Sequence, residues 1–573
     1  MSIAWAGAIA LVTIVLVARF ATKLSVAAPL ILVVVGIGYS LIPGTPPIEA
    51  KPELILVGVL PPLLYAAAVT VPVIDMRRNL KAIGTLSVTL VILSTAISGA
   101  VLYLVFPDLD IAPALALGAV VSPTDAVAAT SVGKRLGLPP RLVTVLEGEG
   151  LVNDASALVL LRSAIAATAG AVTFWGVVGD FVFAVLAAIA IGLVIGRLAV
   201  AVRARLHNPV LTTATSFAVP FLAYLPAEYV GASGVLSVVL AGLVTGHHGA
   251  RVLTAQDRIS ERLNWHTIQF VLENGVFLLL GVELQGLVQA VEEDQLGVGI
   301  AVLIGLLISA VLIVVRLLVT FALVGTLRRD ARRAARQGTR LDAASEQMGA
   351  MRERLKESYP DSARVRERVR RWTRFLARRR ADVDFATTQG LDWRGGAVLG
   401  WSGMRGVVTL AAAQTLPRDL PYRPQLVLVA FTVAFVTLLL QGGTLPAVIR
   451  WLQVQGGGAR EQQQELAGLL EEITDAGLSA ISDENLAATG DEVNPEVLER
   501  VRREARTRLA AARETDEHGP DAQYRMLRRR ALDAERGALL EARSIGAHSS
   551  EALTRAQHVL DQEETRLMGR SED

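Results

Sequence analysis

The sequence predicts an all-α polytopic membrane protein with about thirteen transmembrane helices and a helical cytoplasmic tail. Two observations favour this fold class. Apolar residues make up 52% of the 573 residues, and within residues 1–326 and 391–454 they form nearly continuous runs of 17 to 30 residues. An apolar helix of about 20 residues crosses a bilayer, so these runs are long enough to span it. They lack the two-residue alternation of an outer-membrane barrel, which argues against that architecture.

The composition also excludes several kinds of site. The chain has no cysteine, so it has neither disulfides nor thiolate metal ligands, and its seven histidines show no metal-ligand spacing. We therefore expect no cofactor, and nothing in the sequence indicates a nucleic-acid partner. The first apolar run has no basic leading region and no small-residue cleavage site, so we interpret it as a first span and not as a removed signal peptide.

Proline, glycine and charged residues divide the apolar runs into thirteen predicted spans. In chain order they cover residues 3–20, 26–42, 53–72, 80–106, 111–133, 141–168, 173–202, 209–226, 231–248, 264–290, 297–327, 391–415 and 424–453. Short connections join the first eleven, and a long charged insertion separates the eleventh from the twelfth. Only the odd-numbered connections are rich in basic residues: Arg19 and Lys23; Arg77, Arg78 and Lys81; Lys134, Arg135 and Arg141; Arg203 and Arg205; Arg251, Arg258 and Arg262; and the insertion.

Excess Lys and Arg mark the cytoplasmic side of a membrane. The alternation therefore places the N-terminus outside the cell membrane and the tail in the cytoplasm. Thirteen spans divide as six, one and six, and the second six then run opposite to the first, as in an inverted-topology repeat. The fifth and twelfth spans would correspond, and both have polar interruptions, at residues 121–125 and 401–406. Interrupted helices at matching positions indicate an ion site near the middle of the membrane.

The two soluble parts differ in character. Residues 328–392 contain 18 Lys and Arg against 10 Asp and Glu. We interpret this segment as a solvated helical insertion in the cytoplasm, with contact to anionic lipid headgroups as the alternative. The tail has the Ala, Leu, Glu and Arg composition of helices. No ligand can be assigned to either part.

Ionisable side chains at membrane depth are costly and are usually functional. The deepest ones in the predicted spans are Asp125, Glu149, Asp154, Arg162, Arg316 and Arg405. Four others should lie nearer span ends or in a funnel: Glu147, Glu228, Glu273 and Glu283. Their spacing suggests which of them bind an ion.

Pro123 should break the fifth span, because proline lacks an amide donor and clashes with the preceding turn. Asp125 can then face the amides of a half-helix N-terminus. Arg405, flanked by Gly403 and Gly406, can serve the opposite helix ends in the twelfth span. For both charges, a purely structural role and direct ion ligation remain open.

The sixth span carries two acids within one and a half turns. Glu149 and Asn153 are four residues apart and share a helix face, and so do Gly150 and Asp154. We expect the glycine to leave room for a hydrated ion beside Asp154. A carboxylate in a wet cavity binds either a proton or a hard cation such as sodium, and competition between the two produces exchange. We assign Glu149 as the partner of Arg316, which leaves the Asp154 carboxylate free to bind the cation.

These motifs carry a family resemblance. The segments Ser122-Pro-Thr-Asp-Ala-Val127, Leu146-Glu-Gly-Glu-Gly-Leu-Val-Asn-Asp-Ala155, Gly403-Met-Arg-Gly406 and Leu60-Pro-Pro-Leu-Leu-Tyr65 resemble those of bacterial sodium/proton antiporters of the monovalent cation:proton antiporter-1 family. The resemblance extends over residues 1–455. It implies a homodimer with dimerisation parts and a mobile six-helix core that crosses at two broken helices.

The resemblance also implies a division of the chain. The interface parts are 1–79 and 173–290, the core parts are 80–168, 297–327 and 391–454, the insertion is 328–390, and the tail is 455–573. The implied residue roles are ion and proton binding by Asp154, its neighbour Asn153 and the carbonyl of Thr124; a structural ion pair of Glu149 and Arg316; and charge compensation at the broken helices by Asp125 and Arg405. An Asn–Asp pair implies electroneutral exchange of one cation for one proton, serving pH and salt homeostasis.

Two residues depart from the family pattern. Gly150 and Ala66 stand where many members have a hydroxyl and an acid near the ion. Sodium, potassium and lithium therefore all remain open as the cation. A channel or cation-gated sensor is the alternative function, but no filter-like repeat is visible. A membrane enzyme is a weaker alternative, since the chain has neither a metal motif nor a Gly-x-Ser-x-Gly nucleophile motif.

Overall fold

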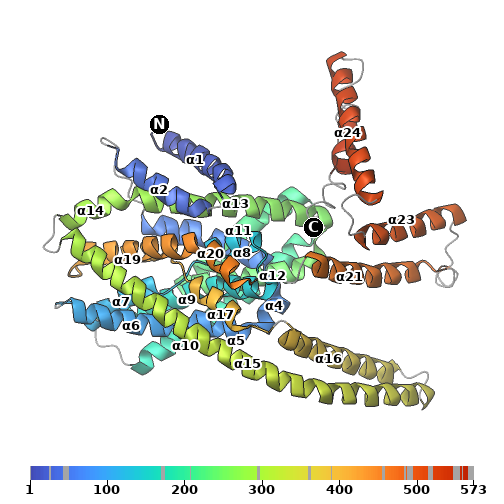
Figure 1. The fold of residues 1–573 in the computed structure, drawn as a ribbon, viewed down its shortest axis with the longest axis horizontal. Helices are drawn as coiled ribbons and strands as arrows, with labels where there is room; N and C mark the ends of the chain where they lie inside the picture. The colour runs from blue at the N-terminus through green and yellow to red at the C-terminus, as the bar shows by residue number, and fades with distance from the viewer. Residues whose placement is uncertain are drawn as a thin grey trace. The chain divides into compact units, whose positions relative to one another are not determined.

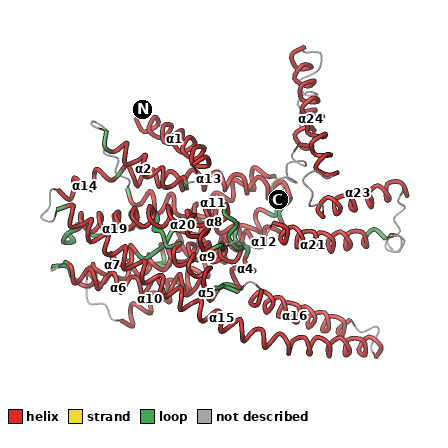
Figure 2. The backbone as a smooth tube through the Cα atoms, viewed as in Figure 1, coloured by secondary structure: helices red, strands yellow, loops and turns green. Residues whose placement is uncertain are grey.

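The computed structural model describes residues 2–24, 27–42, 51–106, 108–169, 174–206, 208–292, 297–358, 363–388, 390–454, 459–482, 486, 494–513, 520–545, 555–557 and 559–564. Throughout these residues the regular structure is helical, and no strand occurs (Figure 2). The chain divides into two units, Met1–Gly456 and Gly457–Asp573. The first unit holds all the predicted spans, and the second is the tail.

Helices occupy every predicted span in chain order (Figure 1). The first half contains α1 (Ser2–Leu24), α2 (Ala28–Ser40), the π-helix η1 (Leu54–Val59), α3 (Leu60–Thr70), α4 (Val73–Arg78), α5 (Leu80–Gly84), the π-helix η2 (Thr85–Thr89), α6 (Leu90–Val105), α7 (Ile111–Val121), α8 (Ala126–Arg135) and α9 (Pro140–Ala169). It is followed by α10 (Phe174–Arg203), α11 (Pro209–Tyr229), α12 (Gly234–Val252), α13 (Ala255–Val282) and α14 (Leu284–Glu292).

The remainder of the first unit contains α15 (Val298–Ser358), α16 (Ala363–Thr388), α17 (Trp393–Trp401), α18 (Val407–Gln414), α19 (Arg423–Thr437), the π-helix η3 (Leu438–Gly442) and α20 (Gly443–Leu452). The second unit contains α21 (Ala459–Ala480), α23 (Pro495–Arg513) and α24 (Pro520–Ile545). Among the described residues, eight helices are long and apolar enough to cross a membrane. The count of thirteen spans and the inverted repeat stay predictions, because several of the other apolar helices are short or broken.

Both predicted interruptions are breaks in the structure. The fifth span is α7 and α8, separated by residues 122–125, and the twelfth is α17 and α18, separated by residues 402–406. Pro123 lies in the first break, where its missing amide and ring stop the helix. The second break contains Gly403 and Gly406, and glycine favours irregular backbone over helix.

The helix of the eleventh span continues beyond the predicted end of that span. The sequence suggested an end at residue 327, where the apolar run stops, but α15 continues to Ser358. No proline interrupts residues 298–358, and Pro360 follows soon after. Helix α16 then runs back alongside the distal half of α15 (Figure 1). The insertion is therefore a helical hairpin that is continuous with a membrane helix.

The hairpin is also attached to the ends of other helices. Asp382 of α16 accepts hydrogen bonds from Arg77 at 3.4 Å and Arg78 at 3.0 Å. Two guanidinium groups lie over the Phe385 ring, with the Cζ of Arg78 5.1 Å and the Cζ of Arg141 5.0 Å from the ring centroid. Arg141 belongs to the first turn of α9. The insertion is thus solvated over only part of its surface.

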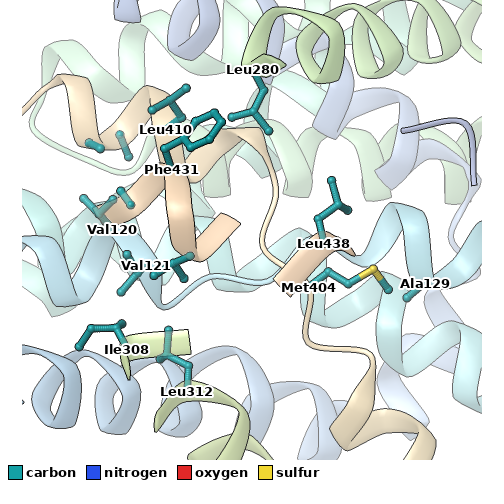
Figure 3. Packing of buried hydrophobic residues seen from close by; sticks show 14 of the residues in the cluster. Val120, Val121, Ala129, Leu280, Ile308, Leu312, Met404, Leu410, Phe431 and Leu438 are labelled. Carbon is teal, nitrogen blue, oxygen red and sulfur yellow. The ribbon is translucent and has the colours of Figure 1, made fainter. Parts of the chain in front are cut away.

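A large apolar core surrounds the two helix breaks (Figure 3). Its members include Val120 and Val121 before the first break, Met404 within the second, Leu410 of α18, Phe431 of α19, and Ile308 and Leu312 of α15. All of these side chains are buried. Close packing of this kind holds the irregular backbone at the breaks in one conformation.

Candidate ion-binding site

The first break is fixed by Asp125, which caps α8. Its Oδ1 accepts a hydrogen bond from the amide of Val127 at 2.8 Å. Its own amide donates to the carbonyl of Met404, in the second break, at 2.7 Å. A Cβ atom at Gly406 would lie 2.6 Å from Asp125 Oδ2, so only glycine lets the carboxylate approach the start of α18. Asp125 thus compensates helix N-termini on both sides of the crossing.

Arg405 compensates the C-terminus of α7, in the fifth span, and also binds a carbonyl in the break of its own twelfth span. Its Nε donates to the carbonyl of Val121, the last residue of α7, at 3.2 Å. A terminal nitrogen donates to the carbonyl of Gly403. The sequence suggested that Arg405 serves the helix ends in the twelfth span, and the structure adds a contact with the end of the fifth. The reason is the crossing, which brings α7 within reach.

Glu149 and Arg316 are brought together across 167 residues of sequence. The two terminal nitrogens of Arg316 donate to the two carboxylate oxygens of Glu149, with the Nη2–Oε2 distance at 2.9 Å. Arg316 is fully buried and Glu149 is 2% exposed. The Arg316 Nε donates to the carbonyl of Leu399 at 3.2 Å. Removing one partner of such a buried pair costs about 3–5 kcal/mol, because the other charge is stranded.

Thr124 and Asn153 extend this network. The Thr124 hydroxyl donates to Glu149 Oε1 at 2.6 Å. Asn153 Nδ2 donates to the Thr124 carbonyl at 2.8 Å and to its hydroxyl at 2.9 Å. The carbonyl that the sequence analysis assigned to an ion therefore already accepts one hydrogen bond and retains one lone pair. Asn153 is buried, and among the described residues its Oδ1 has no hydrogen-bond partner.

Asp154 differs from all its charged neighbours. Within the described part of the chain it has no hydrogen bond or ion pair, and its side chain is half-buried. On one side it lines a cavity of about 830 Å³, between α3, the first break, α8, α9, α12 and α13. On the other side it meets a void of only about 10 Å³. Apolar side chains close that void, including Leu158, Leu161 and Val408.

The cavity extends from Asp154 to basic residues of the fifth and ninth connections. These are Lys134, Arg135, Arg258 and Arg262. Both connections are predicted to be cytoplasmic. A hydrated cation can therefore reach Asp154 through the cavity from that side, while the tightly packed apolar side chains oppose passage to the other side.

Gly150 and Ala66 both line the cavity. For Gly150, however, the structure gives a different reason from the one the sequence suggested. A Cβ atom there would lie 2.9 Å from the Cβ of Ala126, at the start of α8. Glycine is thus required for the close approach of α9 to α8, besides leaving open space near Asp154.

Arg162, one of the deep charges in the sequence, lies away from this site. It forms an ion pair with Glu228 at 2.5 Å. The other carboxylate oxygen of Glu228 accepts from the amide of Gly234 at 2.9 Å, at the start of α12. Through Glu228, the pair ties α9 to the last turn of α11 and to the start of α12.

Sequence reasoning missed three polar groups on the cavity wall or behind it. Arg203, interpreted as a loop charge, forms a buried ion pair with Glu261 at 2.6 Å. Gln269 and Asn274 line the cavity on α13, beside Glu273. The available signal for Gln269 was its spacing from Glu273, because polar side chains four residues apart in an apolar helix share a face. Asn274 has no polar residue at that spacing before it. No sequence signal points to Arg203.

Comparisons with known proteins agree on the kind of molecule. The family model described as "Sodium/hydrogen exchanger, transmembrane" matches residues 8–451. The uncharacterised Na+/H+ exchanger YjcE of Escherichia coli is 28% identical over 543 residues, covering 90% of this chain and 89% of that protein. A sodium, potassium, lithium and rubidium/H+ antiporter of Bacillus subtilis is 31% identical over 274 residues, 46% of this chain and 41% of the relative. The fold is similar to that of the sodium/proton antiporter MjNhaP1 of Methanocaldococcus jannaschii, with a TM-score of 0.56, 17% identity, and coverage of 79% of this chain and 98% of that one.

Proposed function

The chain belongs to the sodium/hydrogen exchanger family, and we propose that it exchanges a monovalent cation for protons across the cell membrane, electroneutrally and by alternating access. It is a multi-pass membrane transporter and not an enzyme. Sodium is the first cation to test. Potassium and lithium are alternatives, because Gly150 and Ala66 have no side-chain oxygen that could bind one of these cations in preference to the others. We propose further that it works as a homodimer, with the N-terminus outside and the tail in the cytoplasm.

One observation carries the proposal. Asp154 is a carboxylate without an ionic partner among the described residues, and it lies at the inner end of a large cavity. The neighbouring Glu149 is neutralised by Arg316. One free carboxylate holds either one proton or one monovalent cation. The two ligands therefore displace each other, and each half of the cycle carries one positive charge, which makes the exchange electroneutral.

The closed side of the site supports alternating access over a channel. Leu158, Leu161 and Val408 leave no space for a hydrated ion beyond Asp154. A channel needs a continuous pore, whereas a transporter has its site open to one side at a time. We infer that the core part moves against the interface part to expose Asp154 on the other side.

The test is exchange in proteoliposomes that contain a pH-sensitive dye and carry an imposed pH gradient. Adding the chloride of sodium, potassium or lithium should dissipate the gradient, and a clamped membrane potential should not change the rate. Asp154→Asn should abolish the exchange while the protein stays folded. Asp180→Asn is the matched control, since Asp180 is exposed on α10 and lies outside the cavity. Normal exchange by the Asp154 variant would overturn the mechanism.

A further inference from the structure

A stripe of polar side chains follows one face of α13 along the cavity wall. Its members are Arg258, Arg262, His266, Gln269 and Glu273, spaced by three or four residues, and all of them line the cavity. Residues with this spacing lie on one face of a helix. Arg258 and Glu273 are fifteen positions apart, which corresponds to roughly 22 Å of helix. The stripe therefore leads from the basic connections towards the inner part of the cavity.

Two of the acids on the cavity wall are neutralised by basic partners. Glu147 pairs with Lys134 at 2.7 Å, and Glu261 pairs with Arg203 at 2.6 Å. Glu273, like Asp154, has no Lys, Arg or His within ion-pair distance among the residues that the structure describes. A third acid on the wall, Asp125, caps α8. A cation that enters past Arg258 and Arg262 thus meets two acids that have neither an ionic partner nor a capping role among the described residues, Glu273 on α13 and Asp154 on α9.

Glu273 has oxygen-bearing neighbours that fit a cation. The side chain of Gln269, one turn before it, lines the same cavity. Asn274 also lines the cavity and is only 5% exposed. Its Nδ2 donates to the carbonyl of Phe270 at 2.8 Å, which leaves the Oδ1 as the free atom, and no described residue donates to that oxygen. A buried amide oxygen without a donor is a suitable ligand for a positive ion.

We propose that Glu273 and the Oδ1 of Asn274 form a second, weaker binding site for the transported monovalent cation, which holds the ion in the cavity before it reaches Asp154. Carboxylate and amide oxygens are the ligands that hard cations prefer. The site binds weakly because it offers one carboxylate and one amide oxygen, and water must supply the other ligands. The proposal rests on the proposed antiport and adds a waiting position to it.

The location of the site explains what it contributes. The basic residues near the connections repel a cation, and an acid farther along the wall offsets that repulsion before the ion reaches Asp154. Asp154 lies on the predicted core part and Glu273 on the predicted interface part. The site therefore serves the cation only when the cavity is open on this side, and it should affect cation binding from the cytoplasm alone.

The first experiment measures cation-dependent exchange in everted and in right-side-out membrane vesicles. Glu273→Gln should raise the KM for the cation about tenfold in everted vesicles, with a maximal rate within about twofold of the original, because binding and not turnover is lost. Asn274→Leu should raise the same KM by a smaller factor. In right-side-out vesicles neither variant should change it. The matched control is Glu292→Gln, an exposed acid at the end of α14 that lies outside the cavity.

The second experiment measures equilibrium binding of radioactive sodium, or of another cation that the unaltered protein exchanges, to the purified full chain. Asp154→Asn should retain weak binding, and Asp154→Asn combined with Glu273→Gln should lose it. An unchanged KM in both Glu273→Gln and Asn274→Leu would overturn the second site, and so would a change of the pH profile without a change of KM. Either result leaves the antiport proposal intact as long as Asp154→Asn alone is inactive.

Discussion

At the scale of single residues, the charged side chains around Asp154 share one property: each of them already has a partner in the protein. Asp125 caps α8, Glu149 holds Arg316, and Arg405 binds carbonyl groups at the breaks. These contacts fix the site without drawing on the Asp154 carboxylate. That carboxylate therefore remains available to a proton or a cation.

Gly150 provides the sharpest test at this scale. Gly150→Ser places a Cβ 2.9 Å from the Cβ of Ala126 and should push α9 away from α8. We expect a loss of about 1–3 kcal/mol in stability, as for other overpacked contacts. Thermal unfolding of the detergent-purified protein measures it. Adding Ala126→Gly removes the atom that clashes and should restore most of the loss, and a double variant as unstable as the single one would contradict this account.

At the scale of elements, the α15–α16 hairpin differs most from its expected character. It does not hang free in solvent, because Asp382 and Phe385 attach α16 to α4 and to the start of α9. Helix α9 is the helix that carries Asp154. The hairpin thus contacts the first turn of the helix that carries the candidate ion-binding carboxylate.

Asp382→Ala combined with Phe385→Ala should release α16 while the membrane helices stay folded. Exposed ion pairs contribute about 0–1 kcal/mol each, so global stability should fall only slightly. Limited trypsin digestion measures the release, since Arg378, Arg379 and Arg380 on α16 should be cut faster. The matched control is Glu367→Ala, an exposed acid of α16 whose ion pair is with Arg371 of the same helix. Unchanged digestion of the double variant would show that these contacts do not hold the hairpin.

At the scale of the whole molecule, one carboxylate that binds two competing ions determines how transport depends on pH. A lower pH fills Asp154 with protons, so more cation is needed to displace them. Over the range in which the site is mostly protonated, each pH unit should change the apparent KM for the cation about tenfold, with the higher KM at the lower pH. Exchange rates in proteoliposomes over a pH series measure this. A constant KM with a falling maximal rate would contradict this prediction, because the proton that controls exchange would then bind to a group other than Asp154.

Several features of this protein follow from the sequence alone. The long apolar runs located the membrane helices, Pro123 located one helix break, and the Asn153–Asp154 pair singled out the candidate carboxylate. Each of these signals is local, because hydropathy, proline geometry and helical spacing act within a few neighbouring residues. These signals do not depend on how the helices are arranged in space.

Only the tertiary structure decided the contacts between distant parts. Arg405 contacts the end of α7, and Gly150 lies close to Ala126. Arg203 pairs with Glu261. Glu273 and Asn274 line the same cavity as Asp154. Such contacts depend on which helix faces pack together, and the local sequence around each residue does not indicate that packing. The sequence thus determined that Asp154 is the candidate acid, and the packing of helices around it decided that it alone of the two acids on α9 near the breaks remains free.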